Sequence, residues 1–443
     1  MEREPQKADV IVIGGGASGL PAAICAAERG DRVILLEAQE QIGKKILASG
    51  NGRCNIMNIG PLRYYGDAAF AEKVFSACDR EKITAFLKHW GLYLSAEGDL
   101  VYPATFQAKS VVLAFKNALT LLHVPMLCGH RVVCIRKERN RFFVQTQEEC
   151  FEAKRVILSS GGAAAGKLGG CEDGYRFLKS LGHPVTEIRP ALVPILTDLR
   201  SISGLSGIRI RCRLTLLHGK TEVHREEGEA LFGGDGVSGI CAMQMARFLS
   251  EETGFVLERK KGKQNLNSQK NRTTNVNLKY QEQENWLEMQ TLHRYFESPA
   301  EVVNAFEERK KRVASLPPTA LLTGLLPEKM AYAVCKQAGQ PMRGETIGDL
   351  SHEQMLAIAE SALHYRMRIT GTKGMEMAQV SAGGADTAFF STRTMESRIV
   401  SGLHVTGEVL NVDGDCGGYN LMFALATGIL AGENGRLGKD ECR

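Results

Sequence analysis

Apolar and small residues follow one another in a regular order at the start of the chain. Residues 10–13 are wholly apolar, residues 14–19 are mostly glycine, an alanine-rich stretch then runs to residue 29, and residues 33–36 are again wholly apolar. A short, wholly apolar run is typical of a strand that is buried on both faces, as in a parallel sheet covered by helices. The order therefore predicts a βαβ unit, in which a helix joins two parallel strands.

Further along, the pattern predicts more strands. The stretches 130–135 and 141–145 lie on either side of a short polar turn, as in a β-hairpin. Residues 155–158 form another apolar run, which leads into Ser-Ser-Gly-Gly. The texture changes from about residue 190, and the alternation over 208–216 suits a half-exposed antiparallel strand, so we expect an inserted domain there.

The second half of the chain is predicted to contain a polar loop, several helices and a return to the first domain. Residues 259–279 include seven Lys or Arg and no acidic residue, which favours a solvated loop. Helical spacing covers 286–316 and 327–338, and a further helix begins at Ser351. The apolar stretch 421–431 covers only about half of a membrane span, so we expect a buried helix. The predicted domain order is 1–190 for the first part of an α/β domain, 191–258 for a β-rich, barrel-like insert, 259–282 for the polar loop, 283–369 for a helical insert and return, and 370–443 for the second part of the α/β domain.

Composition and charge narrow the classes of partner. The chain has 443 residues, of which 44% are hydrophobic and 24% are charged, as is typical of a globular protein. Its net charge is only +5, so we expect a small-molecule substrate and neither nucleic acid nor a membrane as a partner. The polar start without a long apolar core predicts a cytoplasmic protein. The twelve cysteines form no CxxC pair and no Cys/His cluster, so we expect reduced thiols and no metal.

The glycine-rich segment has the spacing of a dinucleotide-binding turn. Gly14, Gly16 and Gly19 follow the first predicted strand directly and open the predicted helix, and Glu37 ends the second strand. In such a turn the first glycine allows a tight bend, the second lets a pyrophosphate approach the helix N-terminus, and the third lets helix and strand pack closely. Glu37 would then accept hydrogen bonds from ribose hydroxyls. The alternative is a glycine-rich turn without a ligand, and the pattern alone does not choose between NAD and FAD.

Three longer segments resemble the BaiN/YhiN-like flavoproteins, a group with aminoacetone oxidase-like members. They are GKKILASGNGRCN at 43–55, GLHVTGEV at 402–409 and DGDCGGYN at 413–420, and they accompany the glycine turn at 14–20. The resemblance implies an α/β fold with a Rossmann-like FAD-binding domain that an insert divides into two parts. It also implies an FAD-dependent oxidoreductase that takes electrons from NAD(P)H and reduces an activated C=C bond, in a steroid-like or bile-acid-like enone. The alternatives are a flavin amine oxidase of the aminoacetone oxidase kind and a flavin-binding protein without catalysis.

These segments provide a set of expected FAD contacts. Lys44, Lys45 and Arg53 would place positive charge beside a diphosphate or an anionic flavin, although a basic surface turn could use the same residues. Glu408 would bind ribityl hydroxyls, and Gly418 would open a last helix whose dipole favours reduced, anionic flavin. The expected cofactor-binding residues are Gly14, Gly16, Ala17, Ser18, Gly19, Glu37, Ala38, Lys44, Lys45, Gly52, Arg53, Cys54, Asn55, Val133, Ser160, Gly161, Gly407, Glu408, Gly418, Asn420 and Leu421.

Two of these residues carry further expectations. Cys54 has no neighbouring cysteine, so we expect a packed thiol beside the isoalloxazine rather than a redox partner. Val133 is expected to contact adenine through its backbone. By the same resemblance, the Ser-Ser-Gly-Gly turn at 159–162 approaches the cofactor where related flavoproteins carry an Ala-Thr-Gly turn.

A second glycine run, at Gly234, Gly236 and Gly239, formally matches the first. No second βαβ pattern follows it, so we expect a tight turn into a helix rather than a nicotinamide site. The flavoproteins that the chain resembles carry Thr-His where this chain has Gly233 and Gly234, which removes an imidazole that could act as an acid or base. The sequence therefore indicates no catalytic residue, and it does not indicate the oligomeric state. Four side chains could donate a proton but are expected to be structural: Tyr102, His183, His404 and Tyr419.

Overall fold

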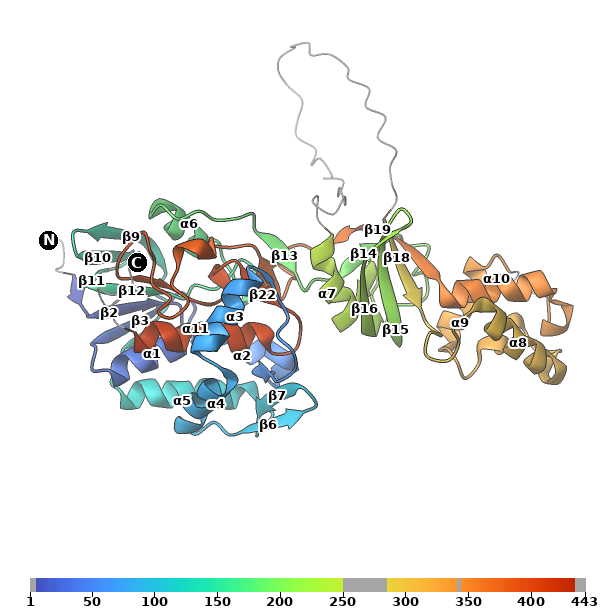
Figure 1. The fold of residues 1–443 in the computed structure, drawn as a ribbon, viewed down its shortest axis with the longest axis horizontal. Coiled ribbons are helices and arrows are strands. Elements are labelled where there is room, and N and C mark those ends of the chain that lie inside the picture. The colour runs from blue at the N-terminus through green and yellow to red at the C-terminus, as the bar shows by residue number, and fades with distance from the viewer. Residues whose placement is uncertain (1–4, 250–284, 341–343, 435–443) are drawn as a thin grey trace, which may run out of the picture. The chain divides into compact units, whose positions relative to one another are not determined.

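The computed structural model describes residues 5–249, 285–340 and 344–434. Contacts divide the chain into two units, which we call the α/β unit and the insert unit (Figure 1). The α/β unit comprises the chain up to Ala191 and the chain from Gly374 onwards, and the insert unit is Leu192–Lys373. The predicted polar loop at 259–282 lies outside the described residues.

A five-stranded parallel sheet forms the centre of the α/β unit. Its order is β21-β12-β2-β3-β8, so a strand from the C-terminal part of the chain completes a sheet begun at the N-terminus. The predicted βαβ unit is confirmed, because β2 and β3 pair in parallel through Val10 and Val33, and helix α1 joins them. The elements are β2 (Val10–Ile13), α1 (Gly19–Glu28), β3 (Val33–Glu37), β8 (Met126–Cys128), β12 (Arg155–Leu158) and β21 (Leu403–Val405).

The last helix packs closely on the first. In Figure 1 the red helix α11 (Tyr419–Glu433) lies beside the blue helix α1. A Cβ added at Gly428 would lie 2.2 Å from the Ser18 carbonyl oxygen, and one at Gly432 would lie 2.5 Å from that of Ala22. The two glycines therefore allow the helix backbones to touch, and the helix predicted to be buried at 421–431 is confirmed. The other helices of the unit are α2 (Lys44–Ala48), α3 (Ala68–Ala77), α4 (Arg80–His89), α5 (Ala108–Leu121) and α6 (Asp173–Ser180).

Smaller sheets border the central sheet. The predicted hairpin is confirmed as β9 and β10, which pair antiparallel in a four-stranded sheet of order β1-β11-β10-β9. Three further sheets have the orders β4-β7-β6, β22-β5 and β13-β20. The strands are β1 (Gln6–Lys7), β4 (Met57–Asn58), β5 (Tyr64–Gly66), β6 (Leu94–Glu97), β7 (Leu100–Pro103), β9 (Val132–Glu138), β10 (Arg141–Thr146), β11 (Cys150–Ala153), β13 (Arg189–Ala191), β20 (Val380–Ala382) and β22 (Val412–Gly414).

The insert unit is built on a closed six-stranded barrel of order β14-β17-β16-β15-β18-β19, with every neighbouring pair antiparallel. The strand predicted at 208–216 is β15, in which Ile210, Cys212 and Leu214 are buried between exposed or half-buried arginines. The predicted fold class, a Rossmann-like α/β domain with a barrel-like and helical insert, is therefore confirmed. The elements are β14 (Ile195–Thr197), β15 (Arg209–His218), β16 (Thr221–Phe232), β17 (Gly236–Ser238), α7 (Ile240–Met245), β18 (Asn285–Gln290), α8 (Pro299–Val313), α9 (Glu328–Gln337), α10 (His352–Leu363) and β19 (Tyr365–Thr372).

The helix predicted over 286–316 is wrong at its start. Strand β18 occupies that region and pairs with β15 and β19, and α8 begins only at Pro299, capped by Ser298. Leu287 and Met289 alternate into the barrel. Glu288 is also buried, but it is paired with His364 and Arg366 on neighbouring elements, which sequence periodicity cannot reveal. The helix predicted from Ser351 is confirmed, and Ser351 caps it.

Candidate functional site: a dinucleotide cradle in the α/β unit

The three glycines of the first turn have different surroundings. A Cβ at Gly14 would lie 2.3 Å from the Ser159 carbonyl oxygen, and one at Gly19 would lie 1.8 Å from that of Gly14. A Cβ at Gly16 would have no heavy atom within 4 Å. The first and third glycines therefore serve protein packing, whereas the second faces open space at the start of α1. This is the arrangement that the pyrophosphate of FAD requires, so the residues present fit the cofactor.

Glu37 is fixed at the end of β3 by two backbone amides. Its Oε2 accepts a hydrogen bond from the Gly15 N–H at 2.6 Å, and its Oε1 accepts one from the Gln39 N–H at 2.7 Å. Each carboxylate oxygen has a second lone pair, so ribose hydroxyls can still donate to it. The predicted ribose ligand thus also orients the glycine turn. Ala38, the next residue, is exposed.

A cluster around Asp173 borders the place where the sequence predicts adenine. Asp173, in the first turn of α6, accepts hydrogen bonds from Arg131 at 2.6 and 2.9 Å and from Arg176 at 3.0 Å. Arg176 also donates to the Val133 carbonyl at 3.1 Å. Burial tends to raise the pKa of Asp173, but the bonds from both arginines outweigh it and hold the pKa below its usual value. The neighbouring His130 N–H donates to the Glu37 carbonyl at 2.9 Å, so this cluster is continuous with the ribose end.

The sequence pattern did not indicate Asp173, Arg131 and Arg176 as neighbours of this site. Asp173 follows the Ser-Ser-Gly-Gly segment and lies in the first turn of α6, and this position could have marked it as a residue near the site. Nothing in the sequence showed that Arg131, 42 residues away, reaches it.

The turn after β12 lies against the glycine turn. Ser159 and Thr406 share a buried hydrogen bond of 2.7 Å between their hydroxyls, which ties the ends of β12 and β21 together. A Cβ at Gly174 would lie 2.0 Å from the Ser160 Oγ, so Ser160 packs on α6. Gly161 has φ of 71° and open space where a Cβ would be, as at Gly16. A second stretch of backbone can therefore approach a ligand here.

The Glu408 side chain contacts three segments of the chain. Its Oε2 pairs with Lys45 Nζ at 3.1 Å, and its Oε1 accepts hydrogen bonds from the Ser381 N–H and hydroxyl at 2.8 and 3.1 Å. A Cβ at Gly162 would lie 2.4 Å from the same Oε1. Lys45 and Glu408, which the sequence assigned separately to the cofactor, thus meet as an ion pair. The adjacent Gly407 packs on Ser18, whose Oγ would lie 2.8 Å from an added Cβ.

The remaining basic residues of the 43–55 segment already have partners. Lys44 donates to the Gln39 side chain at 2.8 Å. Arg53 pairs with Glu97 at 2.8 Å, and its guanidinium lies over the Tyr102 ring, 4.5 Å from the centroid. Arg53 is thus held on the β6–β7 hairpin, and its assignment to the diphosphate stays a prediction.

The 50–55 turn also places two other predicted residues. Gly52 has φ of 83° and is open to solvent. Cys54 is fully buried, and burial raises the pKa of its thiol to about 11. Burial therefore favours the protonated, packed thiol over the thiolate at Cys54.

The C-terminal glycines shape the start of α11. A Cβ at Gly418, where φ is 96°, would lie 2.6 Å from the Met57 carbonyl oxygen and 2.8 Å from the side-chain amide of Asn55. The Asn420 amide bonds both the N–H and the carbonyl of Gly414 at 2.8 Å, so it holds the turn after β22. Helix α11 has no acidic residue in its first turn, and this leaves its N-terminus suited to an anionic group. Ala17 in the glycine turn and Leu421 in α11 are both partly buried against the core.

The second glycine run has a different structure from the first. Gly236 lies in the barrel strand β17, where a Cβ would lie 2.0 Å from the Ile195 carbonyl oxygen. Gly239 has φ of 93° and leads into the six-residue helix α7. Both neighbours of β17 are antiparallel, so this segment is a tight turn into a helix and not a dinucleotide-binding unit.

The four candidate proton donors have structural surroundings. His183 is buried, shares a hydrogen bond of 3.0 Å with Ser397 and stacks on Phe390. His404 is wholly buried, and burial lowers its pKa to about 4. The Tyr419 hydroxyl donates to the Pro61 carbonyl at 2.9 Å, and the Tyr102 ring stacks beneath the Arg53 guanidinium. Among residues 5–249, 285–340 and 344–434 there is also no group of three His, Cys, Asp or Glu placed to hold a metal ion.

Comparison with known proteins decides the family. The HI0933-like protein Rossmann domain family matches residues 8–434, nearly the whole chain. The chain belongs to the HI0933-like family. This HI0933-like protein is an FAD-dependent oxidoreductase, as the resemblance to BaiN/YhiN-like flavoproteins predicted.

Curated relatives of this HI0933-like protein match over almost their full length. A 3-dehydro-bile acid delta(4,6)-reductase of Clostridium scindens is 32% identical over 428 residues, which cover 95% of this chain and 97% of the relative. Ribosomal RNA dihydrouridine synthases of Haemophilus influenzae and Escherichia coli are 27% and 26% identical, and each comparison covers 95% of this chain and 96% of the relative. No helix in the described part of the chain is long and apolar enough to cross a membrane.

Proposed function

We propose that this HI0933-like protein reduces a C=C bond conjugated to a carbonyl group in a small-molecule enone, with NAD(P)H as the electron donor. The observation that carries the proposal is the full-length similarity to a bile acid delta(4,6)-reductase. The name of the second kind of relative, a dihydrouridine synthase, points to the same chemistry, because the C=C bond of uracil is also conjugated to a carbonyl. Both names share the reaction type and differ in the substrate.

The chain's own residues supply binding, orientation and charge. Bound FAD, once reduced by NAD(P)H, would supply a hydride from N5. The backbone at Gly16 and Gly161 would approach the diphosphate, and Glu37 would accept the ribose hydroxyls. The N-terminus of α11 would stabilise negative charge near the flavin ring. Cys54 is buried and burial raises the pKa of its thiol to about 11, so this residue would stay protonated beside the cofactor.

Charge favours a small molecule over RNA. The whole chain carries a net charge of only +5. Several arginines of the insert unit are paired with carboxylates, including Arg209 with Glu229 at 2.8 Å and Arg294 with Glu227 at 2.9 Å. An RNA-binding surface needs unpaired cations that can replace the counterions of phosphate. These pairs in the described part of the insert unit support a small-molecule substrate, whereas the seven cations of 259–279 lie outside the described residues.

We infer that the nicotinamide binds transiently. The described residues include one βαβ unit with a dinucleotide-binding glycine turn, and the second glycine run lies in an antiparallel barrel. A donor without a dedicated domain would bind on the face that the substrate also uses, and it would have to leave before the substrate binds. This sequence of events predicts ping-pong kinetics, with parallel double-reciprocal lines when NAD(P)H and enone are varied together.

A turnover panel tests the proposal. The holoprotein is mixed with NADH or NADPH and, in separate reactions, a 3-oxo-Δ4 steroid, a ribosomal RNA transcript or aminoacetone. We expect nicotinamide oxidation that depends on the steroid, together with a product two hydrogens heavier. If dihydrouridine forms in the transcript and the steroid is not reduced, the substrate is RNA and not a small-molecule enone. Hydrogen peroxide released from the amine without nicotinamide would make the protein an amine oxidase instead.

A further inference from the structure

Two buried cysteines of the insert unit are in contact with each other. Cys212 lies in strand β15, and Cys241 lies in the first turn of helix α7. Both are free thiols, and their exposed fractions are 0% and 1%. Their side chains share a hydrogen bond. The FAD cradle lies in the α/β unit, so these two thiols are a separate chemical feature of the chain.

Gly228 makes the contact between the two cysteines possible. It lies on β16 directly opposite Cys212, and opposite residues of an antiparallel pair point to the same face of the sheet. A Cβ at Gly228 would lie 3.3 Å from the Cys241 Cβ and 3.9 Å from its Sγ. Cys241 therefore fills the place that a side chain at Gly228 would take. Cβ atoms of opposite residues lie about 5 Å apart, so this place is within reach of the Cys212 thiol.

The shared hydrogen bond makes the two thiols unequal. The Cys212 thiol donates to the Cys241 sulfur, and this bond lowers the pKa of Cys241 although burial raises it. The same contact, together with burial, raises the pKa of Cys212. Cys241 is therefore the more readily ionised of the two, and the thiolate is the form of cysteine that attacks an oxidant.

The first turn of α7 also offers a short route to Cys241. The preceding residue, Ile240, is 56% exposed, so the chain reaches the surface directly beside the buried thiol. Helix α7 has only six residues. A small oxidant therefore needs only a local opening of this short helix to reach Cys241.

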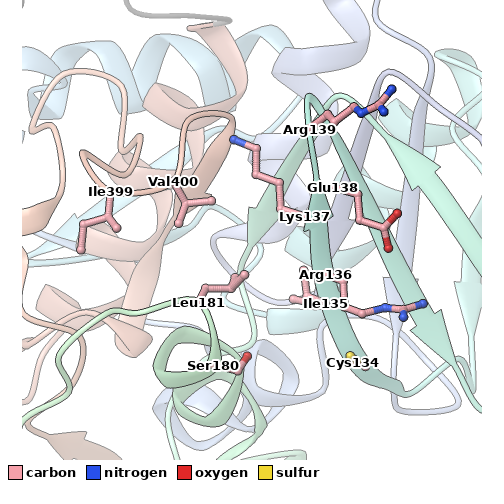
Figure 2. Close-up of a pocket in the computed structure, with 10 residues that line it drawn as sticks. All are labelled: Cys134, Ile135, Arg136, Lys137, Glu138, Arg139, Ser180, Leu181, Ile399 and Val400. Carbon is pink, nitrogen blue, oxygen red and sulfur yellow. The ribbon is translucent and has the colours of Figure 1, made fainter.

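Cys134 provides a contrast in the α/β unit. Figure 2 shows this half-buried cysteine in a pocket whose other lining residues include no cysteine. An oxidant can enter this pocket, but none of the residues that line it supplies a second thiol. Oxidation at Cys134 is therefore expected to stop at a single sulfur.

We propose that Cys212 and Cys241 form a reversible disulfide in response to hydrogen peroxide. The Cys241 thiolate attacks one peroxide oxygen, so the O–O bond breaks and a sulfenic acid forms. The other oxygen leaves as hydroxide and becomes water with the proton that Cys241 released. The Cys212 sulfur then attacks the Cys241 sulfur, so the S–O bond breaks and a second water leaves with the Cys212 proton. Two thiols thus lose two electrons, and one peroxide becomes two waters.

The disulfide would join α7 covalently to β15. It would close a loop of about 30 residues, and such a cross-link stabilises a fold mainly by restricting the unfolded chain. The oxidised protein should therefore melt several degrees higher than the reduced protein. The proposal does not depend on the substrate of the enzyme.

Oxidation of the native holoprotein tests this proposal. The protein is reduced with dithiothreitol, desalted, treated with a small excess of hydrogen peroxide, alkylated, and digested without reductant. We expect mass spectrometry to find two peptides joined through Cys212 and Cys241, with two hydrogens fewer than the separate peptides. Dithiothreitol should separate the pair and return the melting temperature to that of the reduced protein.

Single-cysteine variants provide the controls. Cys212→Ser and Cys241→Ser should each form no cross-link and gain no stability from peroxide. The matched variant is Cys335→Ser, because Cys335 is an equally buried thiol on α9 of the same unit. This variant and Cys134→Ser should both form the cross-link as the wild type does.

Three results would overturn the proposal. One is a wild-type protein in which Cys212 and Cys241 are still free thiols after peroxide has oxidised Cys134. Another is a sulfinic acid on Cys241 without a cross-link, because it would show that Cys212 does not reach the sulfenic acid. The third is alkylation of the buried Cys335 as fast as the cross-link forms, because the thiols would then meet only in an unfolded insert unit.

Discussion

A pair of glycine substitutions in one turn distinguishes cofactor binding from packing. Gly16→Val places a side chain where the structure has open space, and Gly16 does not have left-handed backbone that would strain valine. We therefore expect the apoprotein to keep its stability within about 0.5 kcal/mol. The side chain would occupy the space that the diphosphate needs. We expect FAD affinity to fall at least about 100-fold, which corresponds to about 2.8 kcal/mol.

Gly19→Ala is the matched variant with the opposite result. Its Cβ would lie 1.8 Å from the Gly14 carbonyl oxygen, so the start of α1 must move. Overpacking of this kind costs about 1–3 kcal/mol, and each kcal/mol lowers Tm by about 2–4 °C in a domain of this size. The apoprotein of Gly19→Ala should melt several degrees lower than the wild type.

The assay is thermal unfolding of both apoproteins, followed by calorimetric titration with FAD. The account predicts normal melting with lost FAD binding for Gly16→Val, and lowered melting for Gly19→Ala. Wild-type FAD affinity in Gly16→Val would refute the assignment of this turn to the pyrophosphate. Equal loss of stability in both variants would refute the distinction between the two glycines.

Three further predictions concern other parts of the molecule. The Asp173→Asn variant weakens the hydrogen bonds from Arg131 and Arg176, so we expect FAD to bind about tenfold more weakly. The melting temperature of the apoprotein should stay nearly unchanged. An unchanged FAD affinity would contradict the role of this cluster. His404 has a folded-state pKa of about 4 against an ordinary value of 6.5, so the unfolded chain gains a proton first as pH falls. The free energy of unfolding should therefore drop by up to about 3 kcal/mol between pH 6.5 and 4, as measured by urea unfolding. The His404→Gln variant should lack this drop, and an equally flat dependence on pH in the wild type would contradict the role of His404. Gly236→Val should destabilise the barrel, because a Cβ would lie 2.0 Å from the Ile195 carbonyl oxygen, and should leave FAD bound; lost flavin with an intact barrel would contradict the packing role.

The residues that could be predicted are those whose requirement is local. Gly19, which packs on the Gly14 carbonyl, and the N-cap of α10 depend on neighbours a few residues away, and the sequence displays them directly. Gly14 also faces the Ser159 carbonyl, and Glu37 binds the Gly15 N–H 22 positions away, so for these two the spacing is visible but the contact is not. The Lys45–Glu408 pair joins residues 363 positions apart, so only the fold brings them together. Strand β18 was mistaken for helix because its pattern is imposed by β15 and β19, which lie far from it in sequence. Likewise, the role of Gly236 depends on the barrel carbonyl opposite it.

The most direct test of the proposed function is the oxidative half-reaction by itself. The holoprotein is reduced with dithionite without oxygen and mixed in a stopped-flow instrument with a 3-oxo-Δ4 steroid, while the flavin absorbance is followed. We expect the enone to reoxidise the flavin in a single turnover and to yield one equivalent of the saturated ketone. Reduced flavin that persists with the enone, while aminoacetone reduces the oxidised holoprotein, would contradict the proposed reductase.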